Sequence, residues 1–73
     1  MENFSARLKE LRKTNGKTQR EISISLNITE RNYQHYEAGN HKPNLDTAIA
    51  LADFFNVSLD YLVGRSNDPT PPG

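Results

Sequence analysis

The side chains best suited to acid–base or metal chemistry are His35, Glu37 and His41, which lie close together in the sequence. Glu37 is two residues from His35, and residues at that spacing point to different sides of a helix. The HExxH spacing, which places two zinc ligands on one helical face, does not occur. The chain also offers no Ser/His/Asp arrangement, no glycine-rich phosphate loop and no cysteine. We therefore expect no metal, no cofactor and no catalysis.

The same stretch offers another chemistry, hydrogen bonding to the edges of nucleic-acid bases. Four polar side chains share the helical side that faces away from Tyr33 and Tyr36; they are Glu30, Arg31, Gln34 and His35. Arg31 could bind guanine through O6 and N7, and Glu30 could accept a hydrogen bond from the amino group of cytosine or orient Arg31. For an isolated helix, however, a solvated surface explains such a face better. Both interpretations stay open at this point.

Apolar residues at helical spacing predict the elements that carry these side chains. Phe4, Leu8 and Leu11 recur at i, i+4 and i+7, which is typical of an amphipathic helix. This first helix is expected to run to about Thr14 and to end at Asn15-Gly16.

A second helix is predicted over residues 18–26, because Thr18 and Glu21 have the spacing of a capping box. Thr29 can cap a third helix, which is expected to end near Ala38.

A loop over residues 39–43 precedes Asn44, which can cap a fourth helix. The side of that helix expected to form core comprises Leu45, Ala48, Ile49, Ala52 and Phe55. Ser58 starts a short fifth helix that Gly64 ends, with Leu59 and Leu62 directed inward. No alternation of polar and apolar residues indicates a strand, so the fold class predicted is all-α with five helices.

With 73 residues, the chain can form a single domain, which we place at residues 1–64. Residues 65–73 are rich in proline and are expected to be a flexible tail or the stub of a linker.

No apolar run approaches the roughly 20 residues of a membrane span, and the N-terminus lacks the features of a signal peptide. We expect a cytoplasmic protein with no membrane partner. A core this small makes self-association plausible.

The charges are unevenly distributed, although the formal net charge is zero. Residues 7–42 hold eight basic and four acidic side chains, whereas residues 43–73 hold one basic and four acidic. Such a chain can present a basic face to DNA. Ordinary solvated surface charge explains the distribution about as well.

Between residues 19 and 36, the sequence has the features that a helix-turn-helix requires. Five apolar residues would fill the angle between its two helices; they are Ile22, Leu26, Ile28, Tyr33 and Tyr36. Ser23 is small where the helices approach most closely, and Asn27 tolerates the positive φ angle that the turn needs.

Several segments together resemble the Cro and phage-repressor (xenobiotic-response-element, XRE) family over about residues 4–64. They are Leu11-Arg12, Thr18-Gln19, Leu26-Asn27-Ile28-Thr29, Tyr36-Glu37-Ala38-Gly39, Pro43 and Val57-Ser58-Leu59-Asp60-Tyr61-Leu62. The resemblance implies a compact lambda-repressor-like fold in which helices 2 and 3 form the helix-turn-helix and helix 3 enters the major groove of double-stranded DNA. Asn27 and Asn56 stand where the family usually has glycine.

The resemblance also implies roles for individual residues. Glu30, Arg31 and His35 match base-reading positions, with Gln34 as an addition, and Gln19 matches a residue that binds a phosphate. Further contacts to the DNA backbone are expected from Thr29, Asn32, Asn40 and Lys42. Arg12 and Glu37 match a partly buried ion pair between the first and third helices.

We expect a bacterial, nucleoid-associated repressor that binds a palindromic operator as a homodimer. The dimer interface is placed at the apolar residues near the C-terminus: Phe54, Val57, Leu59, Tyr61 and Val63. Three alternatives remain: an antitoxin with a toxin partner, a restriction-modification controller protein, and a protein-interaction module that does not read DNA. A C-terminal regulatory domain could lie beyond the proline-rich end. The sequence does not explain Ile24, an apolar residue at a position expected to face solvent.

Overall fold

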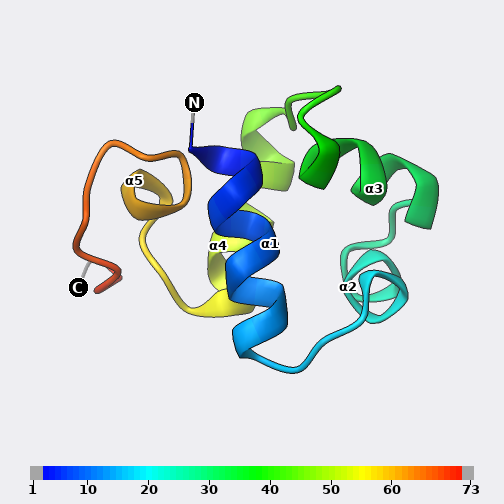
Figure 1. Ribbon diagram of the computed structural model, residues 1–73, viewed down its shortest axis with the longest axis horizontal. Coiled ribbons are helices and arrows are strands. Elements are labelled where there is room, and N and C mark those ends of the chain that lie inside the picture. The colour runs from blue at the N-terminus through cyan, green and yellow to red at the C-terminus, as the bar shows by residue number, and fades with distance from the viewer. Residues whose placement is uncertain (1–2, 72–73) are drawn as a thin grey trace.

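The described part of the chain forms five helices, and their order matches the sequence prediction (Figure 1). The computed structural model describes residues 3–71, so the predicted ends of the domain and the tail, residues 1–2 and 72–73, lie outside the described residues. The helices are α1 (Phe4–Thr14), α2 (Gln19–Leu26), α3 (Glu30–Ala38), α4 (Leu45–Phe55) and α5 (Leu59–Leu62). Residues 3–71 contain no strand, and the all-α prediction is confirmed.

Side-chain caps determine where four of the helices begin. The capping box is complete at α2, where the Thr18 hydroxyl accepts from the Glu21 amide and the Glu21 carboxylate accepts from the Thr18 amide, both at 3.0 Å. Thr29, Asn44 and Ser58 each accept a hydrogen bond from the backbone amide three residues later. These bonds satisfy amides that a helix leaves without partners in its first turn.

Two asparagines end helices in the left-handed conformation. Asn27 follows α2 with a φ angle of 57°, and Asn56 follows α4 with a φ angle of 55°. At the first of these turns the Ile28 amide donates to the Ser23 carbonyl at 3.0 Å, a bond that closes the end of α2. Asparagine therefore takes the place of glycine here because it also accepts a positive φ angle.

The helices pack around α1, which runs through the middle of the molecule (Figure 1). In this view α2 and α3 lie on one side of α1 and α5 on the other, with α4 behind. The core takes side chains from every helix; its fully buried large members are Phe4, Leu8, Ile22, Tyr33, Leu51 and Leu62. Leu11, Leu26 and Ile28 are partly buried and pack against this cluster.

The expected core side of α4 is partly wrong. Ala48, Ala52 and Phe55 are buried, but Leu45 and Ile49 are 66% and 41% exposed. The packed stripe runs through Leu51 instead, at the i, i+3, i+4 and i+7 spacing counted from residue 48. Ile49 lies about 100° around the helix from Ala48, outside that stripe.

An ion pair joins α1 to α3. Arg12 Nε lies 2.6 Å from Glu37 Oε2, and Arg12 Nη2 donates to Glu37 Oε1 at 3.2 Å. The two side chains are only 16% and 5% exposed. Burial by itself would raise the pKa of the Glu37 carboxyl group, but its hydrogen bonds outweigh burial and hold that pKa below its ordinary value.

Arg7 joins the other end of α1 to the C-terminal part of the chain. Its guanidinium group donates to the carbonyls of Tyr61 and Ser66 and lies 4.3 Å from the centre of the Tyr61 ring. The Ser58 amide also donates to the Pro69 carbonyl at 3.0 Å. Residues 65–71 have no helix or strand, but they lie against α5. That they are flexible stays a prediction.

The ion pair makes the stability of the protein depend on pH. The pKa of Glu37 is lower in the folded protein than its ordinary value of 4.5, so its stabilisation is complete above that pH and is lost as pH falls through the folded value. Glu37→Gln should therefore lower the free energy of unfolding by about 3 kcal/mol at neutral pH, and by less at pH 3. Urea unfolding of both proteins measures this difference. A difference that is the same at both pH values would contradict the prediction.

The positive φ angle at Asn27 predicts unequal losses of stability for two substitutions. Asn27→Ala should destabilise the fold by about 1 kcal/mol, because a β-carbon is disfavoured in the left-handed region. Asn27→Gly should cost much less, because glycine adopts this conformation without steric cost. Thermal unfolding of the two variants distinguishes them. Equal losses would show that the side chain of Asn27, and not its backbone conformation, stabilises the turn.

Candidate nucleic-acid interface

The helices α2 and α3 form a tight pair joined by the turn at Asn27. Ser23 is 2% exposed at their contact, and its hydroxyl donates to the Arg20 carbonyl at 2.8 Å. Tyr33 and Tyr36 are buried on the inner side of α3. The small serine and the two anchored tyrosines therefore place α3 against α2, with its opposite side toward solvent.

The residues expected to read bases lie on this outer side of α3. Glu30, Arg31 and Gln34 are exposed. His35 is half-buried; the centre of its ring lies 4.5 Å from that of His41, and its Nδ1 atom lies 3.4 Å from Asn40 Nδ2. The structure thus leaves three of the four side chains free to meet a ligand, whereas His35 also contacts the loop after α3.

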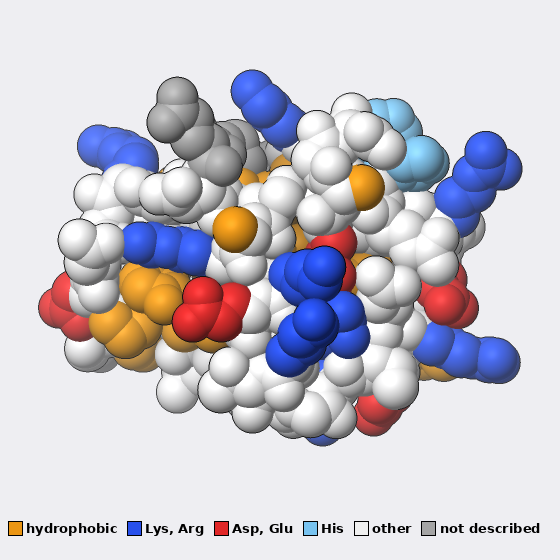
Figure 2. Space-filling view, viewed as in Figure 1, with side chains coloured by type: hydrophobic (Ala, Val, Ile, Leu, Met, Phe, Trp, Pro, Cys, Tyr) orange, Lys and Arg blue, Asp and Glu red, His pale blue; other side chains and the backbone are white. Residues whose placement is uncertain are grey.

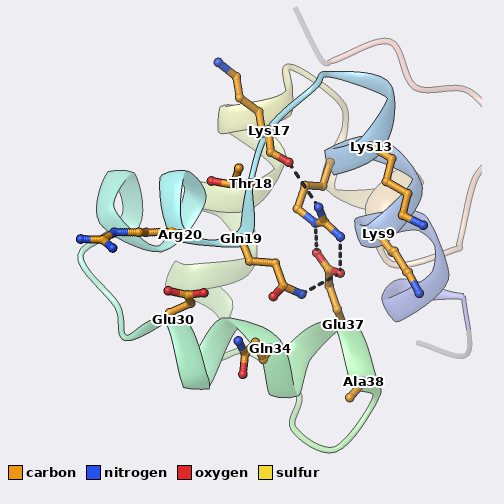
Figure 3. Close-up of a pocket in the computed structure, with 11 residues that line it drawn as sticks. Lys9, Lys13, Lys17, Thr18, Gln19, Arg20, Glu30, Gln34, Glu37 and Ala38 are labelled. Carbon is orange, nitrogen blue, oxygen red and sulfur yellow. Dashed lines mark hydrogen bonds and ion pairs between the residues drawn. The ribbon is translucent and has the colours of Figure 1, made fainter.

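Gln19 lies at the first position of α2, beside the ion pair (Figure 3). Its Nε2 atom donates to Glu37 Oε1 at 3.2 Å, and its side chain is part of the wall of a groove. A phosphate at this end of α2 would meet backbone N–H groups and the positive end of the helix dipole.

The other residues expected to contact the DNA backbone differ in what they already bind. Thr29 caps α3 through its hydroxyl, and Asn32 donates to the Tyr36 hydroxyl at 3.2 Å. Asn40 and Lys42 are exposed in the loop between α3 and α4. Thr29 and Asn32 therefore contribute to the structure of α3 as well.

The structure also shows a basic groove that we define as the space between α1, the start of α2, and α3. Its volume is about 660 Å³, and Figure 2 shows lysine and arginine side chains gathered on this face. Besides Arg12, the basic side chains at the groove are Lys9, Lys13, Lys17 and Arg20. Sequence reasoning counted these residues only as net charge, although Lys9 and Lys13 stand at the i, i+4 spacing that places them on one helical face.

The apolar residues expected at a dimer interface lie mostly inward. Val57 is 8% exposed and belongs to the core, and Phe54, Leu59 and Tyr61 pack against it. Val63 is half-buried. Within residues 3–71, the large apolar side chains that face solvent are three others: Ile24, Leu45 and Ile49.

Within residues 3–71, no group of three or more His, Cys, Asp or Glu side chains could hold a metal ion. None of the described helices is long and apolar enough to cross a membrane.

Comparison with known proteins agrees with this geometry. The family model described as helix-turn-helix matches residues 8–62. The chain is 37% identical over 68 residues to the HTH-type transcriptional regulator YobD of Bacillus subtilis, covering 93% of this chain and 61% of YobD. It is 44% identical over 59 residues to the HTH-type transcriptional regulator ImmR of the same organism, covering 81% of this chain and 46% of ImmR.

A third relative comes from a different organism. The chain is 34% identical over 59 residues to the cryptic phage CTXphi transcriptional repressor RstR of Vibrio cholerae, covering 81% of this chain and 53% of RstR. The chain thus spans about half to three-fifths of the length of these relatives. The matched region includes α2, the turn at Asn27 and α3. The chain therefore belongs to the XRE-type helix-turn-helix family.

Proposed function

We propose that this chain binds double-stranded DNA in a sequence-specific manner and regulates transcription, with α3 as the helix that reads bases. The observation that carries the proposal is the two-sided character of α3. Its inner side is held by the buried Tyr33 and Tyr36, while its outer side presents Glu30, Arg31 and Gln34 to solvent. A helix presented in this way fits the major groove, whose base edges form a distinct pattern for each base pair.

The proposal divides the contacts between two kinds of residue. Glu30, Arg31, Gln34 and His35 meet base edges and choose the sequence. Gln19, Thr29, Asn32, Asn40 and Lys42 meet phosphates and sugars, and so hold the protein in register without reading sequence. We favour repression over activation, because the relative RstR is a phage transcriptional repressor.

A homodimer on a palindromic operator completes the proposal. Two copies would place their α3 helices about 34 Å apart on successive major grooves. Phe54, Leu59, Tyr61 and Val63 are partly exposed near the C-terminal end of the described chain and are the proposed contacts. Val57, also expected there, would support these contacts from within the core.

The first test is selection of bound sequences from a random pool of DNA duplexes. We expect an enriched palindrome whose affinity exceeds that of scrambled DNA and falls steeply as salt rises. Binding without enrichment, weak and insensitive to salt, would contradict DNA reading and favour the protein-interaction module. Copurification with a toxin would instead favour the antitoxin role for the same domain.

Two substitutions test the division of contacts on the selected duplex. Arg31→Ala should cost about 1–3 kcal/mol of binding free energy and relax the preference at one base pair. Gln19→Ala should weaken binding to all sequences about equally. Fluorescence anisotropy against duplexes with single base-pair changes measures both effects, and urea unfolding of Gln19→Ala controls for the lost bond to Glu37. Uniform losses from both variants would refute the assignment of Arg31.

Two matched substitutions test the proposed dimer interface. Val63→Lys should convert a dimer to a monomer in sedimentation experiments, because it places a charge among the proposed contacts. Ile24→Lys makes the same type of change on α2 and should leave the dimer intact. A monomer at high concentration for the unmodified protein, with and without DNA, would overturn the dimer. Dissociation by Ile24→Lys alone would move the interface to α2.

A further inference from the structure

The basic groove has an excess of positive charge that the fold does not use. It is lined by five basic side chains and two acidic ones, Glu30 and Glu37. Arg12 and Glu37 bind each other, so their charges largely cancel within the groove. The remaining side chains are still strongly positive, although the whole chain has no formal net charge. A groove of this kind attracts anions.

Lys9 and Lys13 make the clearest contribution to this charge. They lie one turn apart on α1, are exposed, and extend side by side from the helix (Figure 3). Within residues 3–71, neither forms an ion pair; the pairs found there are Arg12–Glu37 and Arg65–Asp60. Two like charges at this spacing repel each other and slightly destabilise a helix. The repulsion between the two lysines is thus unfavourable in the free protein, and an anionic ligand would relieve it.

The groove is continuous with the proposed base-reading surface. Glu30 and Gln34, which belong to that surface, also line the groove on its α3 side, and Gln19 lies at its α2 side (Figure 3). When a recognition helix enters the major groove, the phosphate strands that border the groove pass on either side of that helix. One of these strands would meet α1 and the start of α2. An extended chain of phosphates matches both the charge and the open shape of this groove.

We propose that the basic groove binds one phosphate strand of DNA, with Lys9 and Lys13 of α1 as contacts that add to those of α2 and α3. The proposal rests on the proposed function, and it extends the DNA contacts to a helix outside the helix-turn-helix. Lys17 stands at the rim of the groove, where its carbonyl accepts from Arg12 Nη1 at 3.3 Å. These lysines contact phosphates and not bases, so they raise affinity for every sequence alike.

The experiment measures DNA affinity against salt concentration for Lys9→Gln, Lys13→Gln and the double variant. Glutamine removes the charge and has a helix propensity close to that of lysine. Arg65→Gln is the control, because it removes one exposed positive charge near α5, away from the groove. The probes are the fluorescent duplex enriched by selection and a scrambled duplex of the same length.

We expect the slope of log affinity against log salt to become shallower by about 0.9 for each lysine removed. The ratio of affinities for the two duplexes should stay the same, and Arg65→Gln should keep the original slope. If the double variant keeps the original slope, or changes it no more than Arg65→Gln, the groove is not a phosphate site while the proposed function stands. If the unmodified protein shows no salt-dependent binding to either duplex, both proposals fail.

Discussion

The ion pair between Arg12 and Glu37 holds the helices around the candidate interface. Arg12 comes from α1 and Glu37 from α3, and the same carboxylate accepts from Gln19 at the start of α2. One buried anion thus connects three helices. Each partner depends on the other, because removing either would leave a charge in a site that water barely reaches. The burial of Glu37 is therefore stable only with α1, α2 and α3 in these positions.

A second buried polar group on α3 is the hydroxyl group of Tyr33, the central aromatic side chain of that helix. Tyr33 is fully buried, and its hydroxyl group makes no hydrogen bond among the described residues. Burial raises the pKa of this phenol, so it remains neutral. An unpartnered buried hydroxyl group is unfavourable, and the packing of the ring must compensate for it. Together Tyr33 and Glu37 hold the inner side of α3, and hydrogen bonding from its outer side depends on this fixed orientation.

The arginines and lysines of α1 have distinct roles. Arg7 binds carbonyl groups of α5 and of the segment after it, and Arg12 binds Glu37. Both arginine side chains therefore have hydrogen-bond partners within the molecule. Lys9 and Lys13 lie between and beyond them on the helix and remain exposed. A count of basic residues therefore overstates the charge available to a ligand, because Arg7 and Arg12 already have partners within the molecule.

The sequence by itself determined the helices and their ends, because these depend on interactions among neighbouring residues. Thr18 and Glu21 form a capping box within one turn, and Asn27 adopts its positive φ angle through its own backbone preference. The outer side of α3 also follows from local spacing, since Tyr33 and Tyr36 mark its buried side. The family resemblance added the expectation that Arg12 and Glu37, 25 residues apart, would pair.

For other side chains, only the tertiary structure decided whether they are exposed or buried. Leu45 and Ile49 have the spacing of core residues, but the neighbours of α4 cover the stripe through Leu51 instead. Arg7 and Lys9 are both basic residues on one amphipathic helix, yet only Arg7 meets distant carbonyl groups. Periodicity states which residues share a side of a helix. Which side is covered, and by what, depends on contacts between segments far apart in the chain, and these exist only once the helices have packed.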